Sequence, residues 1–163
     1  MGVVIRDWHE LRARLDEHRK HGELIVTTNG VFDVLHVGHV RYLKAAAQLG
    51  NRLVVGINSD ESTTRIKGPT RPFNPENDRA EVLAALAFVD YVTIFNEVTP
   101  EAMLTALAPN IHAKGGDYDV ENMPETPVVR AGGGRVVALP FIEGRSTTGL
   151  AERILASASG NSE

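Results

Sequence analysis

The sequence predicts an α/β protein in which helices cover both faces of a doubly wound, mainly parallel sheet. Short runs of β-branched and other apolar residues have the composition of strands that are buried on both sides. Stretches with apolar residues at helical spacing separate these runs, and the connections are short. Parallel strands joined by crossover helices form a doubly wound sheet. The predicted strands are 24–26, 53–57, 91–94, 110–113 and 136–139.

The first two helices are predicted on either side of the first strand. Asp7 is a suitable N-cap for an amphipathic helix that starts at Trp8 and ends before Gly22. A second helix should run from about Gly38 to Gly50, because apolar residues recur there at helical spacing and a glycine suits its end.

The later helices are predicted from their capping residues. Asn74-Pro75 should start a helix with a buried stripe formed by Val82, Leu83, Leu86 and Val89. Before it, 67–72 contains two prolines and a glycine and is expected to be a loop. Further helices should begin after Thr99-Pro100 and at Ser146.

The stretch 28–39 joins the first strand to the second helix and is the predicted active site. A strand, a glycine-containing turn and a helix N-terminus form an anion site, because free N–H groups and the positive end of the helix dipole face the ligand. His36 and His39 lie three residues apart there, so both imidazoles can converge on one phosphate. Gly38 between them allows close approach to the backbone. A zinc site is disfavoured, because Asp33 is the only carboxylate near the pair and transition metals need three or four ligands.

Three further segments could contact an anionic ligand. Arg79 falls on the buried stripe of its helix and therefore needs an anionic partner, either a structural carboxylate or a bound phosphate. Lys114 can reach a phosphate, and the backbone of 115–116 could lie against a flat base, although a tight turn would also use two glycines. Hydroxyls at 146–148 could cap the last helix or bind a triphosphate. Asp60 could meet a ribose or cap the next turn.

The composition is that of a globular protein, and we expect an enzyme that acts on small molecules. The chain has 163 residues, a hydrophobic content of 42% and no cysteine, which fits one domain in a reducing compartment. A net charge of −4 gives no basic footprint for nucleic acid, and no apolar run has the length of a membrane span. We expect a cytoplasmic protein with its domain at 1–156 and a disordered tail at 157–163.

The motifs resemble a known family. Asn29-Gly30-Val31-Phe32-Asp33 and His36-Val37-Gly38-His39 are similar to the H-x-G-H nucleotidyltransferases, which have a Rossmann-like cytidylyltransferase domain. Lys67-Gly68 with Arg71-Pro72, then 114–118 and 144–148, resemble the D-glycero-β-D-manno-heptose 1-phosphate adenylyltransferase branch in the same order.

The resemblance implies a reaction and a set of site residues. A sugar 1-phosphate oxygen would attack the α-phosphorus of ATP, giving ADP-heptose, for lipopolysaccharide or another heptose glycan, and pyrophosphate. His36, His39 and Lys67 would be catalytic, with Mg²⁺ held mainly by the nucleotide phosphates. The implied nucleotide-binding residues are Thr28, Asn29, Gly30, Phe32, Asp33, Gly38, Arg79, Lys114, Gly115, Gly116, Asp117, Arg145, Ser146, Thr147 and Thr148.

The resemblance also implies an oligomeric state and a source of the substrate, and it leaves two alternative functions open. A homodimer is expected, and we expect the sugar kinase of bifunctional relatives to be a separate protein here, because the segment before the first core strand is too short to hold it. The alternatives are a glycerol 3-phosphate cytidylyltransferase and a non-catalytic nucleotide sensor. The glycerol-phosphate branch carries arginine where this chain has Phe141, so a cationic role in that region would rest on Arg145.

Overall fold

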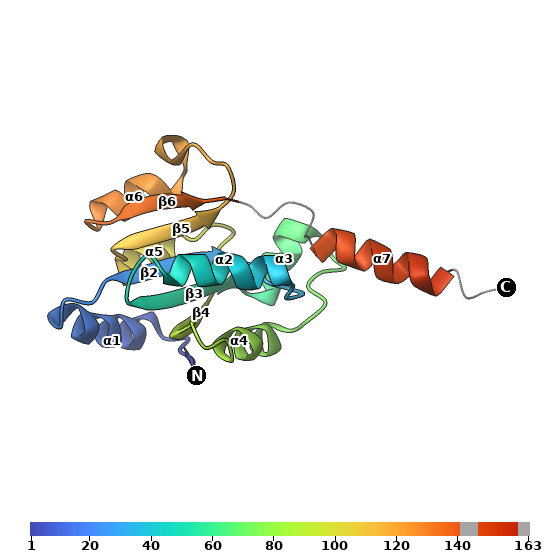
Figure 1. Ribbon diagram of the computed structural model, residues 1–163, viewed down its shortest axis with the longest axis horizontal. Helices are drawn as coiled ribbons and strands as arrows, with labels where there is room; N and C mark the ends of the chain where they lie inside the picture. Colours follow the sequence, from blue (N-terminus) through green and yellow to red (C-terminus); the bar gives the residue numbers. More distant parts are fainter. Residues whose placement is uncertain (141–146, 160–163) are drawn as a thin grey trace.

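The computed structural model describes residues 1–140 and 147–159 and confirms the doubly wound α/β fold. All pairings in its six-stranded sheet are parallel, in the order β1-β4-β3-β2-β5-β6 (Figure 1). Along the chain, β3 and β4 are added on one side of β2, whereas β5 and β6 are added on its other side. The strand order therefore reverses between β2 and β5. The strands are β1 (Val3–Val4), β2 (Ile25–Gly30), β3 (Arg52–Asn58), β4 (Tyr91–Phe95), β5 (Ile111–Gly115) and β6 (Arg135–Leu139).

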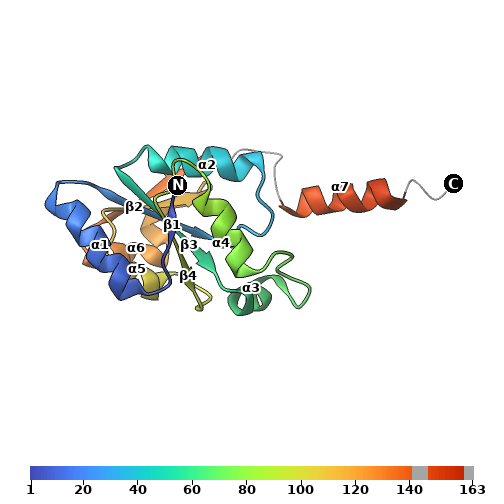
Figure 2. The ribbon, with the colours of Figure 1, turned by 90° about the horizontal axis from the view of Figure 1, so that it is seen from below.

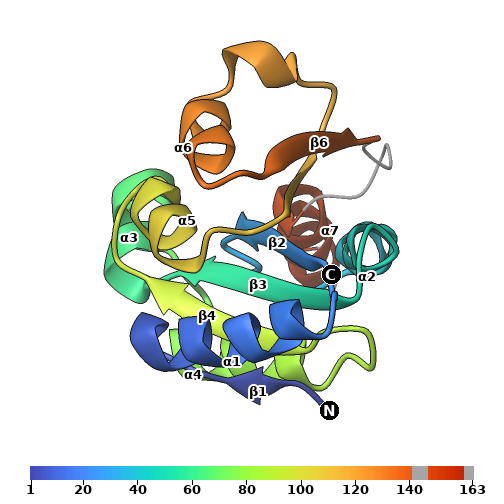
Figure 3. The same cartoon turned by 90° about the vertical axis from the view of Figure 1, so that its left-hand side faces the viewer.

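Helices cover both faces of the sheet (Figures 2 and 3). Apolar side chains of α2 and α4 pack on one face, and those of α1, α5 and α6 pack on the other. The helix α7 projects away from the sheet, with its first residues nearest to the body (Figures 1 and 2). The helices are α1 (Trp8–Lys20), α2 (Val37–Ala47), α3 (Asp60–Lys67), α4 (Glu76–Ala84), α5 (Glu101–Leu107), the short 3-10 helix η1 (Val120–Asn122), α6 (Glu125–Ala131) and α7 (Thr147–Ser159).

Besides the short 3-10 helix η1, three elements were not expected from the sequence. The edge strand β1 is very short, and α3 and α6 bury few apolar side chains, so none of them has a clear hydrophobic period. Lys67 ends α3 instead of lying in a loop. Helix α7 continues to Ser159, so it includes the start of the segment predicted as a disordered tail, whereas 160–163 lie outside the described residues.

Some predicted helix starts and faces are wrong. Asp7 is the N-cap of α1, as expected, and its carboxylate accepts hydrogen bonds from two N–H groups of the first turn. Pro75 and Pro100 occupy the cap positions of α4 and α5, so Asn74 and Thr99 are not caps. The side chain of Val82 is 50% exposed and does not belong to the buried stripe of α4.

A tyrosine on α2 joins three elements near the reversal of the sheet. The hydroxyl of Tyr42 lies 2.5 Å from Thr28 Oγ1 in β2, and it donates a hydrogen bond of 2.9 Å to the carbonyl of Ala113 in β5. Thr28 is completely buried. This contact fixes α2, and therefore its N-terminus, against the two strands that border the reversal.

The carboxylate of Asp33 holds the turn after β2 against the loop before α4. It accepts hydrogen bonds from Arg71 Nε at 2.6 Å, Phe73 N at 2.8 Å and Asn74 N at 2.9 Å. Its side chain is 1% exposed. Burial pushes its pKa upward, but these hydrogen bonds outweigh burial and keep the pKa below the ordinary value. Asp33 is therefore an ionised, buried anchor between two loops.

The guanidinium of Arg79 strengthens the same junction. It donates to the carbonyl of Val31 at 2.6 Å and to the carbonyl of Asn74 at 2.9 Å, and it pairs with Asp60 Oδ1 at 2.7 Å. The side chain of Arg79 is 1% exposed, whereas that of Asp60 is 43% exposed. The anionic partner that the sequence required is thus a carboxylate of the protein. We call Asp33, Arg79 and the main-chain groups that they bind the loop anchor.

Replacing Arg79 by methionine should lower the free energy of unfolding by about 2 to 3 kcal/mol, because two partly buried carbonyls lose their donor and the Asp60 carboxylate loses its partner. The estimate is below that for a fully buried ion pair, since Asp60 can regain water. Urea unfolding measures the change. The exposed Arg130 serves as the control, and its replacement by methionine should change stability by less than about 0.5 kcal/mol. Unchanged stability with lost ATP affinity would contradict the anchoring role and favour direct phosphate contact.

Candidate active site

The candidate site lies at the carboxyl ends of β2 and β5, where the strand order reverses. Ligands of open parallel sheets bind in the crevice at such a position, because the loops on its two sides diverge. Asn29 and Gly30 end β2, Lys114 and Gly115 end β5, and the N-terminus of α2 follows the turn after β2. The structure therefore brings together two segments that the sequence separately singled out.

The N-terminus of α2 is open to an anion. His36 is the N-cap residue with an extended backbone, and its side chain makes no capping hydrogen bond. The first N–H groups of an α-helix have no partner within the helix, and the dipole favours negative charge at this end. The rings of His36 and His39 stack with a centroid separation of 3.8 Å and an interplanar angle of 23°. The two imidazoles thus lie side by side, and their convergence on one phosphate stays a prediction.

Phe32 supports this histidine pair. Its ring lies edge-on to His39 with a centroid separation of 5.2 Å, and it is largely buried. A Cβ at Gly30 would lie 2.9 Å from the Phe32 ring, so glycine is needed there for packing. The backbone of Phe32 is left-handed, with φ of 49°, which is unfavourable for a bulky residue and must be maintained by the surrounding structure. Phe32, predicted to bind nucleotide, packs on protein groups.

His39 remains neutral near pH 7. Burial and, to a smaller extent, the neighbouring His36 lower its pKa to about 4, although a main-chain contact with Val34 opposes both effects. A neutral imidazole has one N–H donor and no net charge. It therefore binds an anion through a directed hydrogen bond and not through general attraction to negative charge.

Several other predicted ligand residues are already bound to protein groups. The Thr28 hydroxyl contacts Tyr42, and Asp33 and Arg79 form the loop anchor. Lys114 Nζ lies 2.5 Å from Glu125 Oε1 and 3.3 Å from Asn29 Oδ1. Their predicted contacts with nucleotide stay predictions, and each would have to form in addition to these bonds or in their place.

The glycines after Lys114 are also explained by neighbouring aromatic rings. A Cβ at Gly115 would lie 3.0 Å from the Tyr42 ring, and one at Gly116 would collide with the Tyr118 ring. Gly116 has φ of 138°, which L side chains rarely adopt. The predicted contact of this backbone with a flat base is untested. Asp117 follows in an exposed position.

Lys67 is an exposed cation at the end of α3, and its ammonium forms no hydrogen bond or ion pair with the described residues. Helix α3 lies at the carboxyl end of the sheet (Figure 1). Two further predicted ligands, Arg145 and Ser146, lie outside the described residues. Thr147 and Thr148 form the first turn of α7, which is the end of that helix nearest to the sheet. Lys67 is thus a cation that can meet a phosphate without giving up a protein partner.

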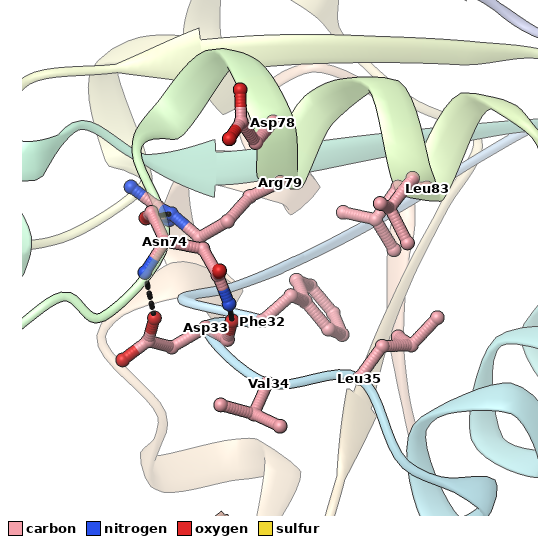
Figure 4. Close-up of a pocket in the computed structure, with 9 residues that line it drawn as sticks. Phe32, Asp33, Val34, Leu35, Asn74, Asp78, Arg79 and Leu83 are labelled. Atoms are coloured by element: carbon pink, nitrogen blue, oxygen red, sulfur yellow. Dashed lines mark hydrogen bonds between the residues drawn. The ribbon is translucent and has the colours of Figure 1, made fainter.

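A pocket of about 280 Å³ lies beside the loop anchor (Figure 4). Neither histidine lines it. Its wall combines the turn after β2 with the first turns of α4, including the exposed Val82. The lining residues are Phe32, Asp33, Val34, Leu35, Asn74, Asp78, Arg79, Val82 and Leu83.

The sequence interpretation missed three residues that shape the site. Tyr42 lies beside the apolar stripe of α2, and its hydroxyl was not expected to join two strands. Arg71 was predicted in a loop, and no partner was predicted for it. Glu125 begins a helix that was not predicted. A buried carboxylate leaves no periodic pattern, and Glu125 lies eleven positions after Lys114, so no local signal in the sequence indicated this pair.

The described residues contain neither a cluster of metal ligands nor a membrane-spanning helix. No group of three or more histidine, aspartate or glutamate side chains in this part of the chain could hold a metal ion. Within the same residues, none of the helices has the length and apolar character needed to cross a bilayer.

Comparison with known proteins shows close relatives along most of the chain. D-beta-D-heptose 1-phosphate adenylyltransferase of Bordetella bronchiseptica is 55% identical over 131 residues, which cover 80% of this chain and 81% of that protein. The bifunctional protein HldE of Syntrophotalea carbinolica is 49% identical over 151 residues, covering 93% of this chain but 31% of that protein. The chain thus spans about a third of the length of the bifunctional relatives it matches.

A solved structure and a family description agree with the fold. The lipopolysaccharide core biosynthesis protein of Thermoplasma volcanium has 30% sequence identity and a TM-score of 0.62, covering 76% of this chain and all of that one. The family described as cytidylyltransferase-like matches residues 27–131, which include both segments of the candidate site. The chain therefore belongs to the cytidylyltransferase-like family.

Proposed function

We propose that the protein transfers AMP from ATP to D-glycero-β-D-manno-heptose 1-phosphate and releases pyrophosphate. The observation that carries the proposal is the 55% identity to a heptose 1-phosphate adenylyltransferase across 81% of that relative. The site supports it, because the open N-terminus of α2 and the stacked pair His36 and His39 form a place for a polyphosphate.

The reaction requires positioning and charge stabilisation from the protein. An oxygen of the sugar phosphate is already anionic and attacks the α-phosphorus, while the bond between this phosphorus and the bridging oxygen breaks. Pyrophosphate leaves with the bonding electrons, so negative charge grows on its oxygens. N–H groups of His36, His39 and the first turn of α2 would donate to these oxygens, and the helix dipole favours the same charge.

Lys67 and Mg²⁺ would complete the neutralisation of charge. Lys67 is exposed at the end of α3 and would hold the incoming sugar phosphate. Mg²⁺ would be held through the nucleotide phosphates, because the buried Asp33 carboxylate is committed to Arg71 and main-chain N–H groups. Bound in this way, the ion would supply further neutralisation of phosphate charge.

We also infer a cytoplasmic homodimer that makes ADP-heptose for lipopolysaccharide or another heptose-containing glycan. The glycan assignment is supported by the solved relative described as a lipopolysaccharide core biosynthesis protein. The cytoplasm is where ATP is available, and the dimer follows the resemblance to the heptose adenylyltransferase branch.

An assay of pyrophosphate release tests the substrate assignment. The purified chain with Mg²⁺ should release pyrophosphate from ATP and heptose 1-phosphate. Heptose 7-phosphate and glycerol 3-phosphate should give none, and CTP should replace ATP poorly. A faster reaction with CTP and glycerol 3-phosphate would overturn the proposal and identify the protein as a glycerol 3-phosphate cytidylyltransferase.

Replacing His39 by alanine should lower kcat by about two to four orders of magnitude and change the Kd of ATP by no more than a few fold. The reason is that a donor acting on developing charge stabilises the transition state more than the ground state. Steady-state kinetics and calorimetry measure the two effects. His9→Ala, at an exposed position of α1, is the control and should keep full activity. Loss of ATP binding with normal kcat at saturation would argue against this role.

Binding of ATP should be coupled to proton uptake by His39. The free site holds the His39 pKa at about 4, and an adjacent anionic phosphate must raise it. A group whose pKa rises on binding takes up protons between its free and bound pKa values, so uptake should appear below about pH 6.5 and vanish at pH 8. Calorimetry in buffers of different ionisation enthalpy measures it. Equal uptake in wild type and His39→Ala would assign the proton to another group.

A further inference from the structure

A partly buried ion pair spans the reversal point of the sheet. Lys114 extends from β5, and its Nζ lies 2.5 Å from Oε1 of Glu125, the first residue of α6. The same Nζ lies 3.3 Å from Oδ1 of Asn29 in the neighbouring strand β2. The side chains of Glu125 and Lys114 are 7% and 22% exposed. An unbroken chain of contacts therefore runs from α6 through β5 to the end of β2.

The charge of Lys114 is balanced inside the protein. Burial would raise the pKa of Glu125, but the hydrogen bond and the charge of Lys114 outweigh burial and keep that pKa below its ordinary value. His112 is completely buried two residues earlier in β5. Burial, reinforced by Lys114, lowers the pKa of His112 to about 4, so it adds no charge near pH 7. An ammonium already paired in this way attracts a phosphate less strongly than a free one.

The same ammonium fixes the orientation of the Asn29 amide. Lysine has three N–H donors and no acceptor, so the amide atom that faces it must be the oxygen. The NH₂ group of Asn29 must then face elsewhere, and it forms no hydrogen bond with the described residues. Asn29 is partly exposed and directly precedes the glycine turn that leads to α2. Its NH₂ group is therefore a donor available to a ligand in the crevice.

We propose that Glu125 is a positioning residue of the active site, which acts through Lys114 to hold the Asn29 amide as a hydrogen-bond donor to a substrate phosphate oxygen. The assignment rests on the proposed function for the identity of the substrates. The phosphate belongs either to ATP or to the sugar 1-phosphate, since both must meet in this crevice. In this arrangement Lys114 orients a neutral donor and does not itself bind the phosphate.

The test compares Asn29→Ala, Glu125→Gln and the double variant. Asn29→Ala should raise the KM of one substrate about tenfold, the effect of losing one hydrogen bond to a charged group, with little change in kcat. Glu125→Gln should raise the KM of the same substrate several fold. In the Asn29→Ala background Glu125→Gln should have less than a twofold effect, because the amide through which it acts is absent. The substrate whose KM rises identifies the phosphate.

Two further variants separate positioning from stability. Glu121→Gln alters an exposed ion pair with Arg130 close to α6, and it should leave both KM values and the unfolding midpoint unchanged. If Glu125→Gln does not fold, Lys114→Met combined with Glu125→Leu removes both charges without leaving one buried alone. This pair should reproduce the KM increase, and it too should lose its effect in the Asn29→Ala background.

The outcomes that overturn the proposal are distinct from failure of the proposed function. Glu125→Gln that lowers the unfolding midpoint and leaves both KM values unchanged would make Glu125 purely structural. An undiminished effect in the Asn29→Ala background would show that Lys114 contacts the phosphate directly. If wild type is inactive on heptose 1-phosphate, the proposed function fails, and the Kd of ATP and of inorganic phosphate, measured by calorimetry, replaces KM in the same comparison of variants.

Discussion

The buried carboxylate of Asp33 is the constraint on which the geometry of the site depends. It binds two main-chain N–H groups and Arg71 of the loop before α4. Because a buried anion without these donors would be strongly unfavourable, the loop and the turn after β2 must stay together. The turn leads directly into His36 and α2, so the position of the histidine pair is set by a residue that need not touch the ligand.

The site separates cations that maintain structure from groups that remain available to substrate. Arg79 and Lys114 lie at the edges of the crevice, and both are paired with carboxylates of the protein. A buried cation must be balanced even when no ligand is present, since the unliganded protein also has to fold. Under the proposed function, phosphate binding would then fall to His36, to the neutral imidazole of His39, to the N-terminus of α2 and to the exposed Lys67.

Glycines in the site motifs have a packing role as well. Gly30 makes room for the Phe32 ring, which in turn contacts His39, and Gly115 makes room for the Tyr42 ring. Both aromatic residues connect a strand end to α2 or its preceding turn. The need for glycine at these positions therefore follows from the protein's own side chains, whatever additional space a ligand requires.

The sequence alone determined the fold class, the buried strands and the position of the histidine pair, because hydrophobic period and the H-x-G-H spacing are local patterns. It also required an anionic partner for Arg79. Only the tertiary structure decided that Asp60 is that partner, that Glu125 balances Lys114, and that α3 and α6 are helices. These features depend on which strands become neighbours and on side chains that meet across loops. The hydrophobic period of a sequence predicts which face of an element is buried, but it does not tell which charged residue of another element will contact that face.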